Sequence, residues 1–249
     1  MGKNSKIEWC DHTFSPWWGC TKVSPGCTNC YAETLSVRYG HEIWGPKASR
    51  RFFGYGHWSE PEKWDAEAKR LDARFRVFCG SMCDVFETRK DLVEYQKRLW
   101  SLIEATTNLN WLLLTKRPEN VQKLAPWGKD WPDNVWLGVS VEDQKRADER
   151  IPVLLSIPAK VRFLSCEPLL GRLTLQYWMA ERLSWLIIGG ESGVGHRTME
   201  LWWLLDIVDW CIASNIPAFV KQDSGRHAGR QGRIPDELWS IKEFPSANP

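Results

Sequence analysis

The amino-acid sequence predicts an α/β fold, a full or partial (β/α) barrel of parallel strands. Short apolar runs alternate with amphipathic helical patterns along the 249 residues, and such alternation builds βαβ units around a parallel sheet. The apolar runs are nearly continuous, which is typical of strands covered on both faces. Six or seven such units account for the whole length, so we expect residues 1–249 to form a single barrel domain.

The runs that predict strands are too short for helices and are rich in β-branched and aromatic residues. The candidate strands are 7–14, 75–79, 111–114, 135–139, 161–164, 185–188 and 218–220. Helical patterns lie at 61–71, 91–103, 143–155 and 199–213, and a further helix is expected to start at Pro118. Pro152 is expected to break its helix or to start a new turn. A doubly wound open sheet is the alternative arrangement of the same elements.

Polar and charged residues follow each of the last six candidate strands. The segments are 80–84, 115–118, 140–143, 165–168, 189–193 and 221–223. The carboxyl ends of parallel strands meet at one face of a barrel, so we expect a site there. Helix N-caps and first-turn acids are the other explanation for several of these residues. That explanation does not suit Lys116, Arg117 and Lys221, because cations oppose the dipole at a helix N-terminus, and these three indicate anion binding.

The most specific local signal is a C-x6-C-x2-C pattern formed by Cys20, Cys27 and Cys30 in a loop rich in glycine and proline. Three thiolates suit a soft metal, either zinc or an iron–sulfur cluster. Structural zinc requires a fourth ligand, for which Cys10 and His12 are candidates. A 4Fe–4S cluster held by three cysteines instead leaves one iron open to an external ligand. Both kinds of metal site are consistent with this spacing.

Composition excludes several classes of protein. With 43% hydrophobic and 26% charged residues, the chain is not disordered, and 8 cysteines are too few for a disulfide scaffold of this length. No apolar run approaches the roughly 18 residues of a membrane span, and the N-terminus has no signal core, so we expect a cytoplasmic protein. The net charge of +2 does not by itself indicate nucleic-acid binding, and the 17 tryptophans are interpreted mainly as core.

Several sequence motifs stand together in one order along nearly the whole chain. They are WWGC, CTNCYAE, GSMCD, LTKRP, WLGVSVE, RFLSCEPLL, GGESG and FVKQ. On these motifs the chain resembles the phage-type three-cysteine-motif family of radical-SAM-like proteins, which was first noted in bacteriophage genomes and also occurs in bacteria. Membership implies a protein of a bacterium or of a phage-infected host cell.

This resemblance implies a (β/α) barrel of radical-SAM type with a cluster-binding loop at 17–33. It implies that Cys20, Cys27 and Cys30 hold a 4Fe–4S cluster and that S-adenosylmethionine is the cofactor. By analogy it also implies reductive cleavage of that cofactor to a 5′-deoxyadenosyl radical, with electrons from an external donor. The sequence departs from the broader radical-SAM pattern, because the first cysteine gap is six residues rather than three and Asn29 replaces the usual aromatic residue.

On this basis the strand-end residues have expected roles. Cofactor contacts are expected from Ser81, Asp84, Lys116, Arg117, Ser140, Gly189 and Gly190. Catalytic roles, in proton transfer or in hydrogen bonding to substrate, are expected from Glu142, Glu167, Glu191 and Lys221. A salt bridge in the barrel mouth is the alternative for each acid. The Gly-Gly-Glu stretch of radical-SAM enzymes follows an early strand and here follows a late one, so its role does not transfer directly to Glu191.

Residues 221–233 suggest the class of substrate. They carry four cations and one acid, a net charge of +3, with three glycines between them. A mobile basic loop suits a phosphate backbone, whereas a solvated loop is the plain alternative. We therefore expect an enzyme that modifies a nucleoside or nucleic acid, and a partner protein that delivers the substrate is a further possibility. The alternatives are a zinc-stabilised nucleic-acid-binding protein without catalysis, and an electron-transfer iron–sulfur protein with Cys10 or Cys83 as fourth ligand.

Overall fold

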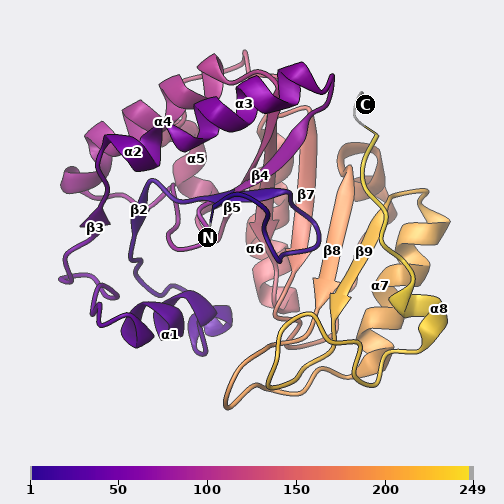
Figure 1. The fold of residues 1–249 in the computed structure, drawn as a ribbon. Coiled ribbons are helices and arrows are strands. Elements are labelled where there is room, and N and C mark those ends of the chain that lie inside the picture. The colour runs from indigo at the N-terminus through magenta and orange to yellow at the C-terminus, as the bar shows by residue number, and fades with distance from the viewer. Residues whose placement is uncertain (1, 247–249) are drawn as a thin grey trace. The chain divides into compact units, whose positions relative to one another are not determined.

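The seven strands of the main sheet follow one another in chain order. The computed structural model describes residues 2–246, and within them the sheet has the order β1-β4-β5-β6-β7-β8-β9 (Figure 1). The pairs β1·β4, β4·β5, β7·β8 and β8·β9 are parallel. A doubly wound sheet reverses its order at a switch point, and this sheet does not. The order runs from β1 to β9 as in an open, partial (β/α) barrel, which confirms the predicted fold class.

The contacts within the chain divide it into two compact units, which we describe separately. The first comprises Met1–Val23 and Ala32–Trp136, and the second comprises Ser24–Tyr31 and Leu137–Pro249. The expectation of one domain over 1–249 stays a prediction.

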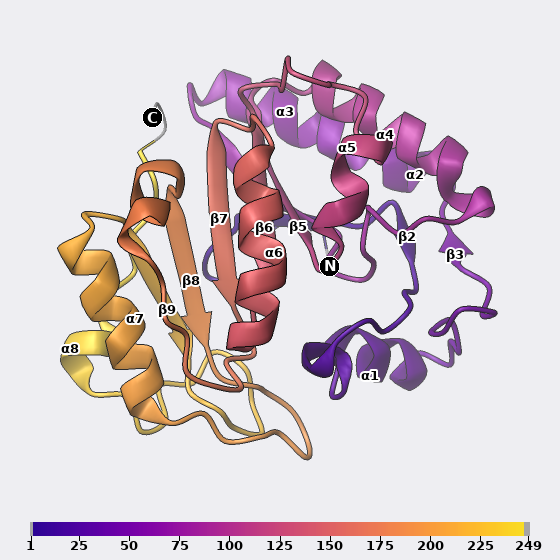
Figure 2. The same cartoon turned by 180° about the vertical axis from the view of Figure 1, so that it is seen from behind.

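The first unit contains three strands of the main sheet and the helices that follow them. Its elements are β1 (His12–Phe14), β2 (Trp17–Trp18), α1 (Tyr31–Arg38), β3 (Arg51–Phe52), α2 (Tyr55–Trp58), α3 (Glu60–Arg70), β4 (Phe75–Cys79), η2 (Lys90–Leu92), α4 (Val93–Ala105), β5 (Leu109–Thr115), η3 (Pro118–Asn120) and α5 (Val121–Leu124). Helices α3 and α4 lie side by side in both ribbon views (Figures 1 and 2). Helix α3 buries Pro61, Trp64 and Ala68, which share one helix face.

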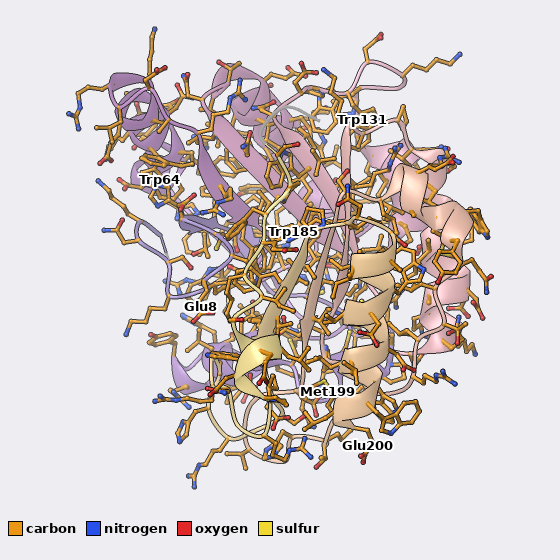
Figure 3. All side chains as sticks on the ribbon, turned by 90° about the vertical axis from the view of Figure 1, so that its right-hand side faces the viewer. Glu8, Trp64, Trp131, Trp185, Met199 and Glu200 are labelled. Atoms are coloured by element: carbon orange, nitrogen blue, oxygen red, sulfur yellow. The ribbon has the colours of Figure 1, made fainter. Side chains whose placement is uncertain are left out.

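The second unit contains the last strands and their two longest helices. Its elements are η1 (Pro25–Cys27), β6 (Val135–Ser140, which begins in the first unit), α6 (Gln144–Ser156), β7 (Val161–Cys166), η4 (Tyr177–Arg182), β8 (Trp185–Gly189), α7 (Leu201–Ala213), β9 (Ala218–Gln222) and α8 (Asp236–Trp239). Helices α6 and α7 cover one face of the strands β7 to β9 (Figure 2). On β8, the fully buried Trp185 (Figure 3) packs its ring 5.7 Å from that of Phe163 and 6.3 Å from that of Phe219.

Most predicted elements are present, two expectations are wrong, and the elements β2, α1, β3, α2, η4 and α8 were not predicted. The first strand covers only His12–Phe14 because residues 5–11 form turns, in which the Ser5 amide donates to the Asp11 carbonyl at 2.8 Å and the Cys10 amide to the Ile7 carbonyl at 3.1 Å. The expected break at Pro152 is wrong, since α6 continues through it. Pro152 lies on the exposed side of α6, so water can bond the carbonyl that its missing N–H leaves unpaired.

The tryptophans serve mainly as core, as the composition indicates. Eleven of the 17 are buried, among them Trp17, Trp64, Trp111 and Trp185. Cys211 on α7 is buried as well. No helix in the described part of the chain has the length and apolarity that crossing a bilayer requires.

We expect Gly138→Ala to destabilise the protein. An added Cβ would lie 2.3 Å from the buried Phe163 ring, and such overpacking typically costs about 1–3 kcal/mol. Urea unfolding followed by tryptophan fluorescence measures this loss. Gly56→Ala is the control, because nothing lies within 4 Å of its added Cβ. Equal stability of Gly138→Ala and wild type would contradict the packing described for β6 and β7.

Candidate functional site

In the first unit, Asp84 organises the polar segments that follow β4 and β5. Its side chain is only 8% exposed. One carboxylate oxygen accepts from the Phe86 amide at 3.0 Å and the Thr115 hydroxyl at 2.8 Å. The other accepts from the Lys116 amide at 3.1 Å and Nη1 of Arg117 at 3.0 Å. With four donors from the chain itself, Asp84 holds Arg117 and the start of its loop in place.

Arg117, which Asp84 holds in place, contacts Cys20 and the next residue, Thr21. Its Nη1 lies 3.6 Å from Sγ of Cys20, and its Nη2 donates to the carbonyl of Thr21. Burial raises the pKa of the Cys20 thiol to about 12, with the Asp84 charge adding to the increase and Arg117 opposing it. Metal binding at Cys20 therefore has to displace a proton from this thiol.

A second buried ion pair, between Arg50 and Glu87, supports Thr21, the residue after Cys20. Nη2 of Arg50 donates to Oε1 of Glu87 at 2.8 Å and to the Thr21 hydroxyl at 3.0 Å. Its Nη1 donates to the carbonyls of Ile43 and Ala48, both at 3.0 Å. Thr21, next to Cys20, is thus held by both Arg50 and Arg117. Arg50 and Glu87 could not be predicted from the sequence, because an ion pair between residues 37 positions apart leaves no local pattern.

In the second unit, Glu142 anchors the turn that carries Cys27. Glu142 follows β6 and is fully buried. Its Oε2 accepts from Nη1 of Arg150 at 2.8 Å, and its Oε1 accepts from the Gly26 amide at 3.1 Å. Arg150 also donates to the Ser140 carbonyl at 2.7 Å. A Cβ at Gly26 would lie 3.0 Å from the Glu142 carboxyl carbon, so glycine permits this close approach.

Glu191 anchors the other half of the same segment. Its Oε2 accepts from Nδ2 of Asn29 at 2.9 Å and from the amide and Nε of Arg197 at 2.8 and 2.9 Å. Nη2 of Arg197 bonds the other Glu191 oxygen and donates to the Pro25 carbonyl at 3.0 Å. Burial alone would raise the pKa of Glu191, but hydrogen bonds from Arg197 and Asn29 outweigh it and lower the pKa. Asn29, the departure from the radical-SAM pattern, therefore links the cysteine segment to Glu191.

In the second unit, a third charged pair joins the ends of β7 and β9. Nζ of Lys221 contacts Oε1 of Glu167, and both side chains are 17% exposed. Behind it, Nε2 of Gln222 donates to the Gly190 carbonyl at 2.8 Å. A Cβ at Gly190 would lie 2.3 Å from the Ser224 amide nitrogen, so only glycine fits between the loops that follow β8 and β9.

The predicted site residues gather in two sets, one in each unit. Ser81, Asp84, Lys116 and Arg117 lie with Cys20 in the first unit, whereas the second unit holds Ser140, Glu142, Glu167, Gly189, Gly190, Glu191 and Lys221 with Cys27 and Cys30. The alternative of a salt bridge is present for Glu142, Glu167 and Glu191. Their expected catalytic roles, and the expected cofactor contacts, stay predictions.

The motif cysteines differ from the others in exposure. None of the eight cysteines is in a disulfide, and Cys20, Cys27 and Cys30 are partly exposed, while the other five are buried. Cys10 and Cys83 are only 4% and 9% exposed, so both thiols are less accessible to a metal ion than those of the three motif cysteines. Among residues 2–246, no three His, Cys, Asp or Glu side chains are already gathered in a metal-binding arrangement.

Comparison with known proteins gives a family and a fold. A family described as "Protein of unknown function (DUF5131)" matches residues 4–238. No curated protein matches the chain. Among solved structures, a mutant of spore photoproduct lyase is similar, with a TM-score of 0.51 and 15% sequence identity over 76% of this chain. The match covers 59% of the lyase chain, so the chain spans less than two thirds of that protein. At this identity the similarity shows the fold alone.

We expect Glu191→Gln to loosen the segment 24–30. The neutral amide loses the charge that holds Arg197 and Asn29, and hydrogen bonds to a charged group contribute about 1.5–3 kcal/mol each. Hydrogen–deuterium exchange at the amides of this segment is expected to quicken at least tenfold. Glu181→Gln, a substitution of an exposed acid in η4, is the control. Unchanged exchange in Glu191→Gln would show that Glu191 does not anchor the segment.

Acid is expected to weaken this anchor and also the pair of Asp223 with Arg233. Arginine partners lower the pKa of Glu191 and of Asp223 against the opposing effect of burial. Their contribution to folding is therefore complete above the ordinary carboxyl range, near pH 4, and is lost as the pH falls through the lowered values. The free energy of unfolding, measured with urea between pH 7 and pH 3, should fall less steeply in Glu191→Gln than in wild type. Parallel curves would contradict this assignment.

Proposed function

We propose that this chain, which belongs to the family described as "Protein of unknown function (DUF5131)", is an iron–sulfur enzyme of radical-SAM type that modifies a nucleoside or a nucleic acid. The proposal rests on the exposure and the support of the three cysteines in the segment 20–30, which we call the cysteine segment. Three partly exposed cysteines stand in a C-x6-C-x2-C spacing, and buried side chains from the strand ends bond the neighbouring residues Thr21, Gly26 and Asn29. The phage-type three-cysteine-motif family remains a narrower prediction within this membership.

The donor set fits a 4Fe–4S cluster. Sulfur is the ligand type that iron–sulfur clusters take, and Cys20, Cys27 and Cys30 are the only cysteines that are not buried. Three thiolates leave one cluster iron for an external ligand, which the proposal assigns to S-adenosylmethionine. When bound, the cluster and this cofactor supply reductive cleavage with electrons from an external donor. A reducing compartment such as the cytoplasm keeps the thiols available.

The residues of the chain serve to position the cysteine segment. Arg117 stands beside Cys20, where its charge favours the thiolate over the thiol once a ligand displaces the proton. Glu142 orients the turn before Cys27 through the Gly26 amide, and Glu191 holds Asn29 just before Cys30. Within each unit these contacts fix the residues beside the cysteines, and such preorganisation limits the entropy cost of binding.

The remaining strand-end groups are proposed to act on cofactor and substrate. At 17% exposed, the Glu167 side chain is more accessible than those of Asp84, Glu142 and Glu191, so we assign Glu167 and its partner Lys221 to proton transfer or to an anionic group of the substrate. Ser81, Lys116, Ser140, Gly189 and Gly190 are proposed cofactor contacts. Asp84 and Arg117 reach the cofactor only indirectly on this proposal, because the carboxylate is saturated by donors of the chain itself.

The comparison supports this proposal at the level of fold. The similar solved structure is named as a lyase of spore photoproduct, and the partial barrel is shared with it. The substrate of this chain, its electron donor and a delivering partner protein are matters for experiment.

We expect anaerobically purified wild-type protein to hold about four irons and four sulfides per chain. Cys27→Ala should lose most of this iron, because it removes one of three ligands. Elemental analysis and sulfide assay measure both values. Cys211→Ala is the matched control, since it removes a thiol buried on α7, away from the motif. One zinc without iron would overturn the proposal in favour of a zinc-stabilised binding protein.

A further inference from the structure

We propose that the loop 224–232, which follows β9, is an arm that binds a nucleic-acid phosphate backbone through Arg226 and Arg230. This inference deepens the proposed function and rests on its nucleic-acid substrate. It does not depend on the cluster, because all of its observations come from the loops that follow β8 and β9 in the second unit.

The base of the loop is pinned to buried groups. Gln222 and Asp223 are 1% and 3% exposed. The Asp223 amide donates to the Arg230 carbonyl at 2.9 Å, and the Gly229 amide donates to Oε1 of Gln222 at 2.9 Å. Gly232 has a φ of +57°, and a Cβ there would lie 2.6 Å from an Asp223 oxygen. These contacts hold the loop at both ends.

Of the four cations in residues 221–233, Lys221 and Arg233 form salt bridges within the second unit, whereas Arg226 and Arg230 differ from them. Lys221 is bound to Glu167, and Arg233 contacts both oxygens of Asp223 at 2.8 Å. Arg226 and Arg230 are exposed, and no salt bridge to either is found among the residues described. The +3 that the sequence assigns to this segment becomes a charge of +2 concentrated at the tip of the loop, beside the exposed His227.

Through Gly225, the residue before Arg226, the loop 224–232 lies against the loop that carries Glu191. The Gly225 amide donates to the Glu191 carbonyl at 3.0 Å, the Gly193 amide donates to the Gly225 carbonyl at 2.9 Å, and Ser192 forms a bridge with Gly225. Both ribbon views show these two loops together beyond the ends of β8 and β9 (Figures 1 and 2). Because the Glu191 side chain binds Asn29, a chain of direct contacts joins the loop to the segment that carries Cys27 and Cys30. A polyanion bound at the tip would thus enter beside the proposed site.

The chemistry of the tip favours a phosphodiester backbone over other anionic partners. The guanidinium fork of arginine matches phosphate oxygens in a bidentate manner. Two cations on one short, fixed loop match a ligand with repeating charges better than a single carboxylate. An anionic membrane surface attracts a protein by about 1 kcal/mol per cation, so two arginines without an amphipathic helix give little membrane affinity. The test below also measures whether the loop binds a phosphorylated peptide instead.

The test measures binding of fluorescein-labelled 20-nucleotide single strands, one of RNA and one of DNA, by fluorescence anisotropy with the full anaerobically purified chain. We expect the slope of log K against log salt to be shallower by about 1.4 in the double variant Arg226→Ala/Arg230→Ala, because each lost phosphate contact removes about 0.7 for a single strand. Between 50 and 200 mM salt, wild-type affinity should then fall about sevenfold more than that of the variant. The strand that binds more tightly assigns the polynucleotide.

Lys69→Ala/Arg70→Ala is the matched control, because it removes the same charge from exposed residues at the end of α3. An unchanged slope in the loop variant, or an equal change in the control, would overturn the inference. Binding of a phosphorylated peptide in place of both strands would do so as well. Iron content measured on the same samples separates the two proposals, since protein without iron that still shows the loop effect contradicts only the enzyme assignment.

Discussion

A carboxylate buried at the end of a parallel strand must be paired, and this requirement governs the cysteine segment. Asp84, Glu142 and Glu191 are each placed by the strand before them and each bonded to an arginine. Loss of one partner from such a pair typically costs about 3–5 kcal/mol, although the pair itself adds little net stability. The benefit is geometric, because the same charged groups reach the backbone or side chains on both sides of the motif cysteines.

The residues that hold the cysteine segment in place therefore differ from those that are available to bind ligands. The most buried acids, Asp84, Glu142 and Glu191, are already bonded to arginine and to other donors of the chain, so they are poorly placed to exchange protons during a reaction. The partly exposed side chains of Lys221 and Glu167 bind each other, and neither is assigned to holding the cysteine segment. Beyond it, the arginines at the tip of the loop 224–232 offer charge without a partner in the described part of the chain. Chemistry and substrate binding are thereby assigned to different groups within one unit.

The fold was predictable from the sequence, whereas the partners within the site were not. Continuous apolar runs mark buried strands directly, and their polar ends located Asp84, Glu142 and Glu191. Which cation would bind each acid depends on tertiary structure, so Arg150 and Arg197 carried no signal, and Arg50 with Glu87 was missed altogether. The sequence likewise overestimates the net positive charge that residues 221–233 offer to a ligand, because Lys221 and Arg233 form salt bridges in the folded chain. Pro152 was misjudged because its exposure is a property of packing.

The central claim is that the cysteine segment supports cleavage of S-adenosylmethionine. The most direct measurement is anaerobic incubation of the iron-loaded protein with a chemical reductant and S-adenosylmethionine, with detection of 5′-deoxyadenosine by chromatography and mass spectrometry. The account predicts that 5′-deoxyadenosine forms with wild-type protein and that Cys27→Ala forms none. Iron-loaded wild-type protein that yields no 5′-deoxyadenosine, with or without added RNA or DNA, would contradict it and leave an electron-transfer protein in its place.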